Sequence, residues 1–259
     1  MKKTALLICA AILLTAPLCA KPKKVSIKGK ADLDGKKIGV QAGTTGELYV
    51  QEEVPGAKLS SFKSGMDAAL DLKNGAIDAV VLDELPAQQI VKRNPKLKII
   101  RDPYFAANKE EYAIAIKKGN AELLNTINAT IAEMKKNGEY EALVAAFMPA
   151  DGNITIPAAK NAKGAKKIKL GTNAAFPPFE YVEGTDIVGF DITMGQKIAE
   201  KASSSLEVVD MAFDSLIPAL QAGTIDFIAA GMSVTEERKK NVDFSEPYFA
   251  SEQVIIVRK

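Results

Sequence analysis

The chain has 259 residues, of which 47% are hydrophobic and 25% charged, a composition typical of a globular protein long enough for two α/β units. Its net charge of +2 gives no reason to expect a nucleic-acid partner. The sequence contains no His, which removes the commonest general base and metal ligand and argues against an enzyme. We expect no cofactor and no metal.

The first twenty residues have the organisation of a secretory signal peptide. Lys2 and Lys3 precede an apolar run over residues 5–14, and Ala20 supplies the small residue of a cleavage site. The apolar run is too short to span a bilayer. We therefore expect residues 1–20 to be removed and the protein to work in the periplasm or another extracytoplasmic compartment.

Both cysteines of the chain, Cys9 and Cys19, lie inside this segment. Lipidation at Cys19 is the alternative to free secretion. Leu18 stands where a lipoprotein signal usually has a small residue, so free secretion is favoured.

The first half of the remaining chain reads as an α/β unit. A helix-like stretch over 67–73 stops at Gly75, and "IDAVVLDE" then forms a β-branched strand that ends at Asp83. "DPYFA" at 102–106 follows, and after it comes the alternating apolar strand "YAIAIKK" at 112–118.

Two helical stretches, about 120–136 and 139–147, are separated by Asn137-Gly138. After them, "MPADGNITIPAAKNAKGAKK" is rich in Ala, Gly, Pro and Lys and has no periodicity. This composition predicts a linker.

The last part of the chain repeats the first unit. "LQAGTIDFIAAGM" at 220–232 matches "LKNGAIDAVVLDE" at 72–84, with Gly223 as the second helix stop. "EPYFA" at 246–250 then leads into a second apolar strand with a basic end, "VIIVRK". Two similar α/β units predict two lobes, with a cleft lined by the loops at the carboxyl ends of their parallel strands.

These segments resemble the polar amino-acid class (family 3) of extracytoplasmic solute-binding proteins of ABC importers. The resemblance rests on "KIKLGTNAAFPPFEY", "FDSLIPALQAGTIDFIAAGMSVTEERKKNVDFSEPYF", "DLDGKKIGVQAGTTGE" and "EMKKNGEYEALVAAF". It implies the two-lobed, type II periplasmic-binding-protein fold: in each lobe a central, mostly parallel sheet is flanked by helices, and the ligand cleft lies between the lobes.

The order of these segments differs from that of the family, in which the FPPFE unit comes first and the two helices end the chain. Such an order is typical of a circular permutation, which is tolerated where the two ends of a fold lie close together on the surface. We expect lobe 2 at 25–105, a covalent hinge crossing at 106–118, family C-terminal helices packed on lobe 1 at 119–148, a linker at 149–165, lobe 1 at 166–253, and a hinge strand at 254–259.

Arg238 and Asp83 are the candidate charged ligand-binding residues. From composition alone, Arg238 in "EERKK" reads as a solvated surface Arg, and Asp83 reads as the cap of the following helix. The resemblance instead implies that the Arg238 guanidinium binds the carboxylate of an amino acid and that Asp83 binds its ammonium.

The resemblance implies further contacts to the two ends of the amino acid. Thr45 and Ser233 would donate to the carboxylate, chiefly through backbone N–H groups at helix starts. The carbonyl of Gly231 would accept from the ammonium.

The side chain of the amino acid would lie between Phe176 and Phe213, with Asn173, Gln41 and Ala230 around it. Phe179, Asp191 and Asp226 read as structural. Relatives that take cationic amino acids commonly have Asp at the position of Asn173, and the charges of Arg238 and Asp83 cancel. A neutral polar side chain is therefore favoured, Gln first, with Arg or Lys as alternatives.

The function implied by the resemblance is the binding of a polar amino acid, by closure of two lobes, for delivery to the membrane permease of an ABC importer. A monomer is expected. The alternatives are a periplasmic dehydratase-like enzyme on the same fold and a sensory protein that reports its ligand to a receptor.

Overall fold

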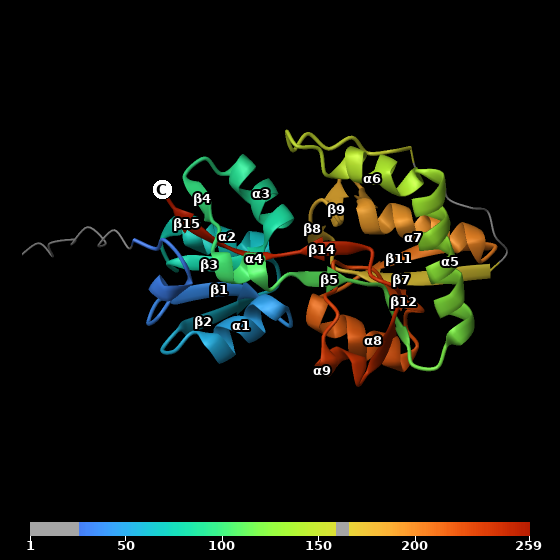
Figure 1. The fold of residues 1–259 in the computed structure, drawn as a ribbon, viewed down its shortest axis with the longest axis horizontal. Coiled ribbons are helices and arrows are strands. Elements are labelled where there is room, and N and C mark those ends of the chain that lie inside the picture. The colour runs from blue at the N-terminus through green and yellow to red at the C-terminus, as the bar shows by residue number, and fades with distance from the viewer. Residues whose placement is uncertain (1–25, 159–165) are drawn as a thin grey trace, which may run out of the picture.

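Two five-stranded sheets, each in its own lobe, lie side by side in a computed structural model that describes residues 26–158 and 166–259 (Figure 1). The predicted signal peptide and part of the predicted linker lie outside the described residues. The arrangement confirms the predicted two-lobed α/β fold, with one difference: each sheet is mixed, because each contains antiparallel strands.

The sheet of lobe 2 is parallel across its first three strands and antiparallel at the fourth. Its spatial order is β2 (Lys58–Phe62), β1 (Lys37–Gln41), β3 (Ala79–Asp83), β15 (Gln253–Arg258) and β4 (Leu97–Ile100). Its helices are α1 (Thr45–Glu53), α2 (Gly65–Asn74), α3 (Glu84–Arg93) and α4 (Pro103–Ala107), with a 3-10 turn at Lys30–Asp32.

The sheet of lobe 1 is built from late strands of the chain and one early strand. Its spatial order is β11 (Ser204–Asp210), β7 (Lys166–Thr172), β12 (Phe227–Ile228), β6 (Ala115–Lys117) and β13 (Val242–Phe244). Its helices are α5 (Ala121–Asn137), α6 (Glu139–Phe147), α7 (Phe190–Lys201), α8 (Leu216–Ala222) and α9 (Glu236–Lys239). The small sheet of β8 (Ala175–Phe176), β9 (Glu180–Glu183) and β10 (Asp186–Val188) lies beside it, and a 3-10 turn forms at Phe213–Ser215.

Helix ends follow local sequence signals. Gly75 and Gly223, predicted to stop helices, end α2 and α8 at φ values of 83° and 74°, a left-handed conformation that suits Gly. Gly138 separates α5 from α6 in the same conformation. The predicted break at Asn137-Gly138 is therefore confirmed.

The two halves of the repeat share one bracing contact. The Asp78 carboxylate accepts from the backbone N–H of Lys37 (3.0 Å), and the Asp226 carboxylate accepts from that of Lys169 (2.7 Å). Each carboxylate ties the turn after a helix to the neighbouring strand. Asp226 is thus structural, as its sequence pattern predicted.

The hinge differs from the expected one. β5 (Glu110–Tyr112) pairs antiparallel with β14 (Phe249–Ser251), so the second segment that crosses between the lobes lies at 249–251 and not at 254–259. Residues 254–259, expected to be the hinge strand, instead belong to the centre of the lobe 2 sheet, where β15 pairs with both β3 and β4. The apolar pattern of "VIIV" is equally compatible with either place, so the pattern alone did not distinguish them.

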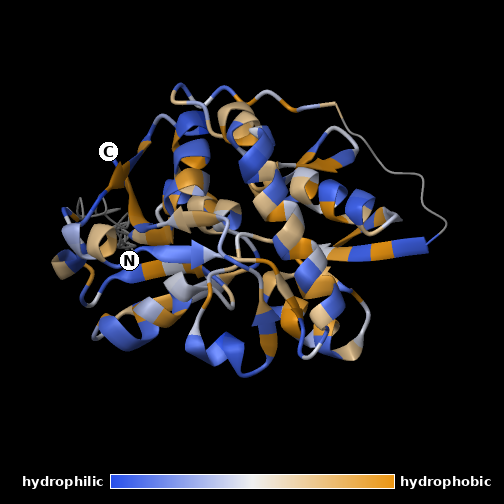
Figure 2. Cartoon of the chain, turned by 45° about the vertical axis from the view of Figure 1, so that its right-hand side comes forward, coloured by the Kyte–Doolittle hydropathy of each residue, from blue (hydrophilic) through white to orange (hydrophobic). Residues whose placement is uncertain are grey.

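β15 is buried on both faces because helices cover both sides of its sheet. Val254 and Ile256 pack toward α2 and α3, whereas Ile255 and Val257 pack toward α1 and α4. The strand leading to the C-terminus is accordingly coloured hydrophobic over most of its length in Figure 2. Within the described ranges, no helix combines the length and the apolar character that crossing a membrane requires.

Ile256→Ala tests whether this C-terminal strand is part of the core. Ile256 is fully buried, so its truncation should lower the free energy of unfolding by about 3 kcal/mol, through lost transfer energy and the cavity left behind. Leu70→Ala, at an exposed position of α2, is the matched control and should cost less than about 1 kcal/mol. Urea unfolding measures both variants, and equal small losses would mean that β15 is dispensable.

Candidate functional site

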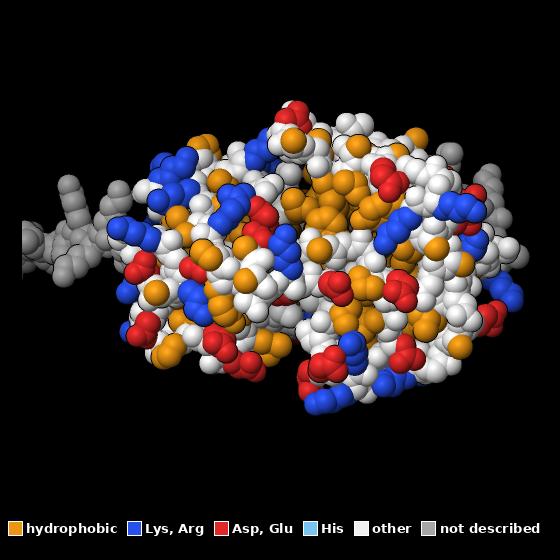
Figure 3. Space-filling model, in the orientation of Figure 1, with side chains coloured by type: hydrophobic (Ala, Val, Ile, Leu, Met, Phe, Trp, Pro, Cys, Tyr) orange, Lys and Arg blue, Asp and Glu red, His pale blue; other side chains and the backbone are white. Residues whose placement is uncertain are grey.

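The carboxyl ends of strands from both lobes meet around a small enclosed cavity. Its volume is about 10 Å³, close to the space that a single water needs, so a larger molecule can enter only when the lobes or their side chains move apart. In Figure 3 the surfaces of the two lobes touch, with an indentation at the lower edge between α1 and α9. The cavity is lined by Gln41, Thr44, Asp83, Phe176, Glu180, Phe213, Ala230, Gly231, Ser233 and Arg238. All the predicted site residues except Asn173 and Thr45 are among them.

Arg238 is buried between the lobes, contrary to its reading as a solvated surface residue. Its guanidinium donates to the carbonyl of Ser233 in lobe 1 (2.6 Å) and to the carbonyl of Gly43 in lobe 2 (3.0 Å). The group lies over the ring of Phe213, 5.4 Å from its centroid. Burial lowers the pKa of Arg238, and the nearby Glu110 carboxylate opposes this shift. A guanidinium has five N–H donors, so donors remain for a carboxylate ligand.

Asp83 occupies the N-cap position of α3, but its side chain does not cap the helix. Its carboxylate accepts instead from the hydroxyl of Tyr112 on the hinge strand and from the hydroxyl of Ser251 (3.2 Å). Burial, followed by the charge of Glu110, raises the pKa of Asp83 to about 7. A cation that reached this carboxylate would therefore stabilise its ionised form.

Two backbone N–H groups face the site from opposite lobes. Thr45 is the first residue of α1, where no intrahelical acceptor exists, and Ser233 lies in the loop before α9. Among the described residues neither N–H has a hydrogen-bond partner. The hydroxyls of both residues donate to Glu110, with 2.7 Å between the oxygens for Thr45. The sequence analysis missed Glu110, because a carboxylate in "NKEEY" reads as a solvated charge.

Gly231 is held by the buried Asp191, which was predicted to be structural. The Asp191 carboxylate accepts from the N–H of Gly231 (2.8 Å) and from the hydroxyl of Tyr248 (2.7 Å). Gly231 has a φ of 52°, and a Cβ there would lie 2.6 Å from the ring of Phe176. A side chain at this position would therefore displace Phe176.

Phe176 and Phe213 both line the cavity from lobe 1. Phe176 stacks on Phe179 with a centroid distance of 5.9 Å, and Phe179 packs against Tyr112 and Phe249 of the two hinge strands. Phe179 is fully buried, which confirms the prediction that it belongs to the core. Phe176 extends this aromatic packing as far as the cavity.

Asn173 and Gln41 lie on opposite lobes and join them. The Gln41 amide donates to the side-chain oxygen of Asn173 (3.0 Å), and the Asn173 amide donates to the carbonyl of Met211 (2.8 Å). Both ends of the Asn173 side chain are thus already hydrogen-bonded. Asn173 joins the lobes beside the cavity and is not among the residues that line it.

Glu180 is a cavity residue that the sequence analysis did not predict. Its carboxyl is fully buried and has no basic partner among the described residues. Burial, followed by the neighbouring Asp191 carboxylate, raises the pKa of Glu180 well above its usual range. The signal was present in "FPPFEY", where an acidic residue directly follows an apolar aromatic stretch.

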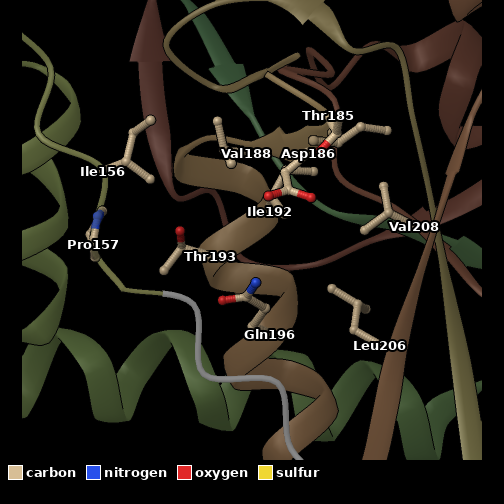
Figure 4. A pocket seen from close by; sticks show the side chains of 11 residues that line it. Ile156, Pro157, Thr185, Asp186, Val188, Ile192, Thr193, Gln196, Leu206 and Val208 are labelled. Carbon is tan, nitrogen blue, oxygen red and sulfur yellow. The ribbon is translucent and has the colours of Figure 1, made fainter. Parts of the chain in front are cut away.

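A second, more open hollow lies on the outer face of lobe 1, between α7, β10 and residues 156–157 (Figure 4). Its volume is about 600 Å³, and among the described residues Asp186 is the only charged one that lines it. No described side chain in its lining is a cation that could hold a carboxylate. Within residues 26–158 and 166–259, no cluster of three potential metal-ligating side chains is present.

Residues 168–259 match the family described as bacterial extracellular solute-binding proteins, family 3. This match confirms the resemblance over residues 168–259, which contain, but for Lys167, two of the segments on which it rests. The arginine-binding extracellular protein ArtP of Bacillus subtilis (strain 168) is 47% identical over 96 residues, which cover 37% of this chain and 38% of that protein. The L-cystine-binding protein TcyJ of Escherichia coli (strain K12) is 35% identical over 134 residues, covering 52% of this chain and 50% of that protein.

The chain thus spans about half or less of the length of these relatives. A solved structure, the arginine-bound form of domain 1 of TmArgBP, is 46% identical, with a TM-score of 0.32. The match covers 36% of this chain and 80% of that one.

The raised pKa of Asp83 predicts that binding of an ammonium depends on pH. Below about pH 7 the carboxyl is protonated, so a bound ammonium must expel the proton. Amino-acid affinity should be constant near pH 8 and should fall toward tenfold per pH unit below about pH 6.5. Calorimetry at pH 5.5 in two buffers of different ionisation enthalpy should detect proton release.

Without added ligand, the free energy of unfolding should fall as the pH rises, whereas the affinity should rise. The folded protein holds the Asp83 proton more tightly than the unfolded chain does, so this contribution to stability is full below about pH 4 and is lost as the pH rises through about 7. Asp83→Asn should make the free energy of unfolding, measured with urea, depend less on pH.

Equal affinities at pH 5.5 and pH 8 would show that the ammonium does not bind at Asp83.

Proposed function

We propose that this chain, whose residues 168–259 match family 3 of the bacterial extracellular solute-binding proteins, captures a free polar amino acid outside the cytoplasm and delivers it to an ABC importer. The observation that carries the proposal is a set of complementary charges between the lobes. The buried guanidinium of Arg238 and the buried carboxylate of Asp83 both line the cavity, and the backbone N–H groups of Thr45 and Ser233 beside it have no partner among the described residues. An α-amino acid presents the matching carboxylate and ammonium.

The carboxylate of the ligand would bind Arg238 together with the backbone N–H groups of Thr45 and Ser233. These donors come from both lobes, so they converge only when the lobes close. The ammonium would bind Asp83 and the carbonyl of Gly231, whose position Asp191 maintains. Each charged end of the ligand thereby favours the closed arrangement.

Arginine is our first candidate for the ligand. Its cationic end would neutralise Glu180, a buried carboxyl that has no basic partner in the described part of the chain. Relatives named as arginine-binding proteins support the same choice. Phe176 and Phe213 would hold the aliphatic part or the planar guanidinium between them.

Glutamine is the second candidate, favoured by the paired amides of Gln41 and Asn173 in the cavity wall. A neutral ligand would leave Glu180 protonated. The relatives named here are binding proteins, which supports binding rather than catalysis. We also propose that the protein is a monomer.

The segment order supports circular permutation. The C-terminus, which follows β15, lies at the outer end of lobe 2 in Figure 1. A chain joined through the predicted 149–165 linker would keep both hinge strands, β5 and β14. Lobe closure would then use the same two crossings whichever segment comes first in the chain.

Arg238→Ala tests the carboxylate site. Removing the guanidinium leaves the ligand carboxylate buried without its cation, which should cost about 3–5 kcal/mol of binding free energy. Lys239→Ala, at the exposed neighbouring position paired with Glu236, is the control and should bind normally. Calorimetry with L-arginine and then L-glutamine measures both variants. If Arg238→Ala binds with undiminished affinity, the ligand does not bind in this cavity.

Glu180→Gln tests the side-chain end of the ligand. The substitution keeps the shape but removes the carboxyl that a cationic side chain would neutralise. The ratio of arginine to glutamine affinity should fall about tenfold, which corresponds to about 1.4 kcal/mol. Glu183→Gln, on the exposed end of the same strand, is the matched control. If the ratio stays constant, Glu180 does not meet the ligand side chain, and glutamine becomes the first candidate.

A further inference from the structure

Glu110 places one carboxylate at the junction of both lobes and the hinge. It is the first residue of β5, the earlier of the two crossing strands, and it is half-buried. Its Oε2 accepts from Thr45 Oγ1 at the start of α1 in lobe 2 (2.7 Å) and from Ser233 Oγ in lobe 1. One oxygen atom thereby links the two lobes.

The other oxygen of Glu110 is tied to the second crossing segment. Gln253 follows β14 and begins β15, and its amide Nε2 lies 3.3 Å from Oε1 of Glu110. The same Nε2 lies 3.4 Å from Thr45 Oγ1. The contacts of Glu110 therefore include both hinge segments as well as both lobes.

These bonds restrict what Thr45 and Ser233 can offer a ligand. A hydroxyl has a single proton to donate, and each of these two protons is given to Glu110. The only donors that remain on the two residues are their backbone N–H groups, which have no partner in the described part of the chain. A ligand carboxylate can thus be bound by these residues only through the backbone.

We propose that Glu110 is a positioning residue for the carboxylate site: by accepting both hydroxyl protons, it sets the separation of Thr45 and Ser233 so that their N–H groups, from opposite lobes, reach one ligand carboxylate together with Arg238. This role rests on the proposed function. Glu110 touches neither end of the amino acid in this arrangement and acts only through the two residues that it holds. Its effect on affinity must therefore disappear when the hydroxyl through which it acts is removed.

A double-mutant cycle tests this dependence. Calorimetry with L-arginine, and with L-glutamine if arginine gives no heat, is performed on the unmodified protein, Glu110→Gln, Thr45→Val and the double variant. Gln keeps the shape of Glu but removes its negative charge and replaces one acceptor oxygen with an NH₂ donor, so it cannot accept from Thr45, Ser233 and Gln253 together. Val keeps the shape of Thr and its N–H but removes the hydroxyl. Each single substitution should weaken binding about five- to tenfold, and the double variant should be no weaker than the weaker single variant.

Two further variants separate positioning from a general effect on folding. Thr45→Ser restores the hydroxyl and should recover the affinity that Thr45→Val loses. Glu111→Gln changes the exposed neighbouring carboxylate on the same strand and should also bind normally. The same cycle is repeated by urea unfolding without ligand, where the denaturation midpoints should show the same non-additivity if the side chains are in contact.

The outcomes are distinguishable. Losses of affinity that multiply in the double variant, or an unchanged affinity in Glu110→Gln, would overturn the positioning role while leaving amino-acid binding in place. No heat with any of the twenty amino acids in the unmodified protein would overturn the proposed function and the role of Glu110 with it. Non-additive losses together with rescue by Thr45→Ser would support the role.

Discussion

The guanidinium of Arg238 is buried at the contact between the lobes, where it can neither lose its charge nor be surrounded by water. The structure satisfies it with two backbone carbonyls, one from each lobe, and with the face of Phe213. None of the ion pairs within the described ranges includes it, so its formal charge is balanced only at a distance, by Glu110 and Asp83. A buried guanidinium of this kind favours a carboxylate ligand. The full negative charge of a carboxylate compensates the buried cation, which the partial charges of two carbonyl groups do only in part.

The acidic groups of the cavity are, like Arg238, buried without an ion-pair partner among the described residues. Asp83 and Glu180 lie in the interior of the lobe contact, and burial raises the pKa of both carboxyls. Asp83 is partly satisfied by two hydroxyls, whereas Glu180 has Asp191 beside it as a further acidic group. The cavity therefore contains more acidic than basic groups, an imbalance that a cationic ligand would reduce.

The fold delivers these groups because each lobe completes its sheet with a strand from the other end of the chain. β6, from the first half, lies between β12 and β13 of lobe 1, and β15, from the last residues, lies between β3 and β4 of lobe 2. The crossings that lead to these strands pair as β5 and β14. Glu110 and Tyr112 lie on one of those crossings and Ser251 on the other. The hinge itself therefore carries the hydrogen-bonding partners of Asp83 and the carboxylate that accepts from Thr45 and Ser233.

Much of this could be predicted from the sequence. The repeated Gly75 and Gly223 signals, the matching Asp78 and Asp226 turns, and the two strands that follow "PYFA" are local patterns, and local backbone chemistry determines where helices stop and strands begin. The residues around Arg238 and Asp83 could be identified because their segments resemble a family, although their composition alone indicated a solvated Arg and a helix cap.

Tertiary structure alone decided the rest. Whether "VIIV" is a hinge strand or the centre of a sheet depends on which strands lie beside it, since an apolar strand is buried in either place. The Asn173 side chain joins the two lobes through Gln41 and Met211, which are distant in sequence, so this contact could not be predicted from the sequence. Glu110 and Glu180 could not be predicted as residues of this region, because a carboxylate in a sequence reads as a solvated charge. Only the packing of the two lobes takes these carboxylates out of water.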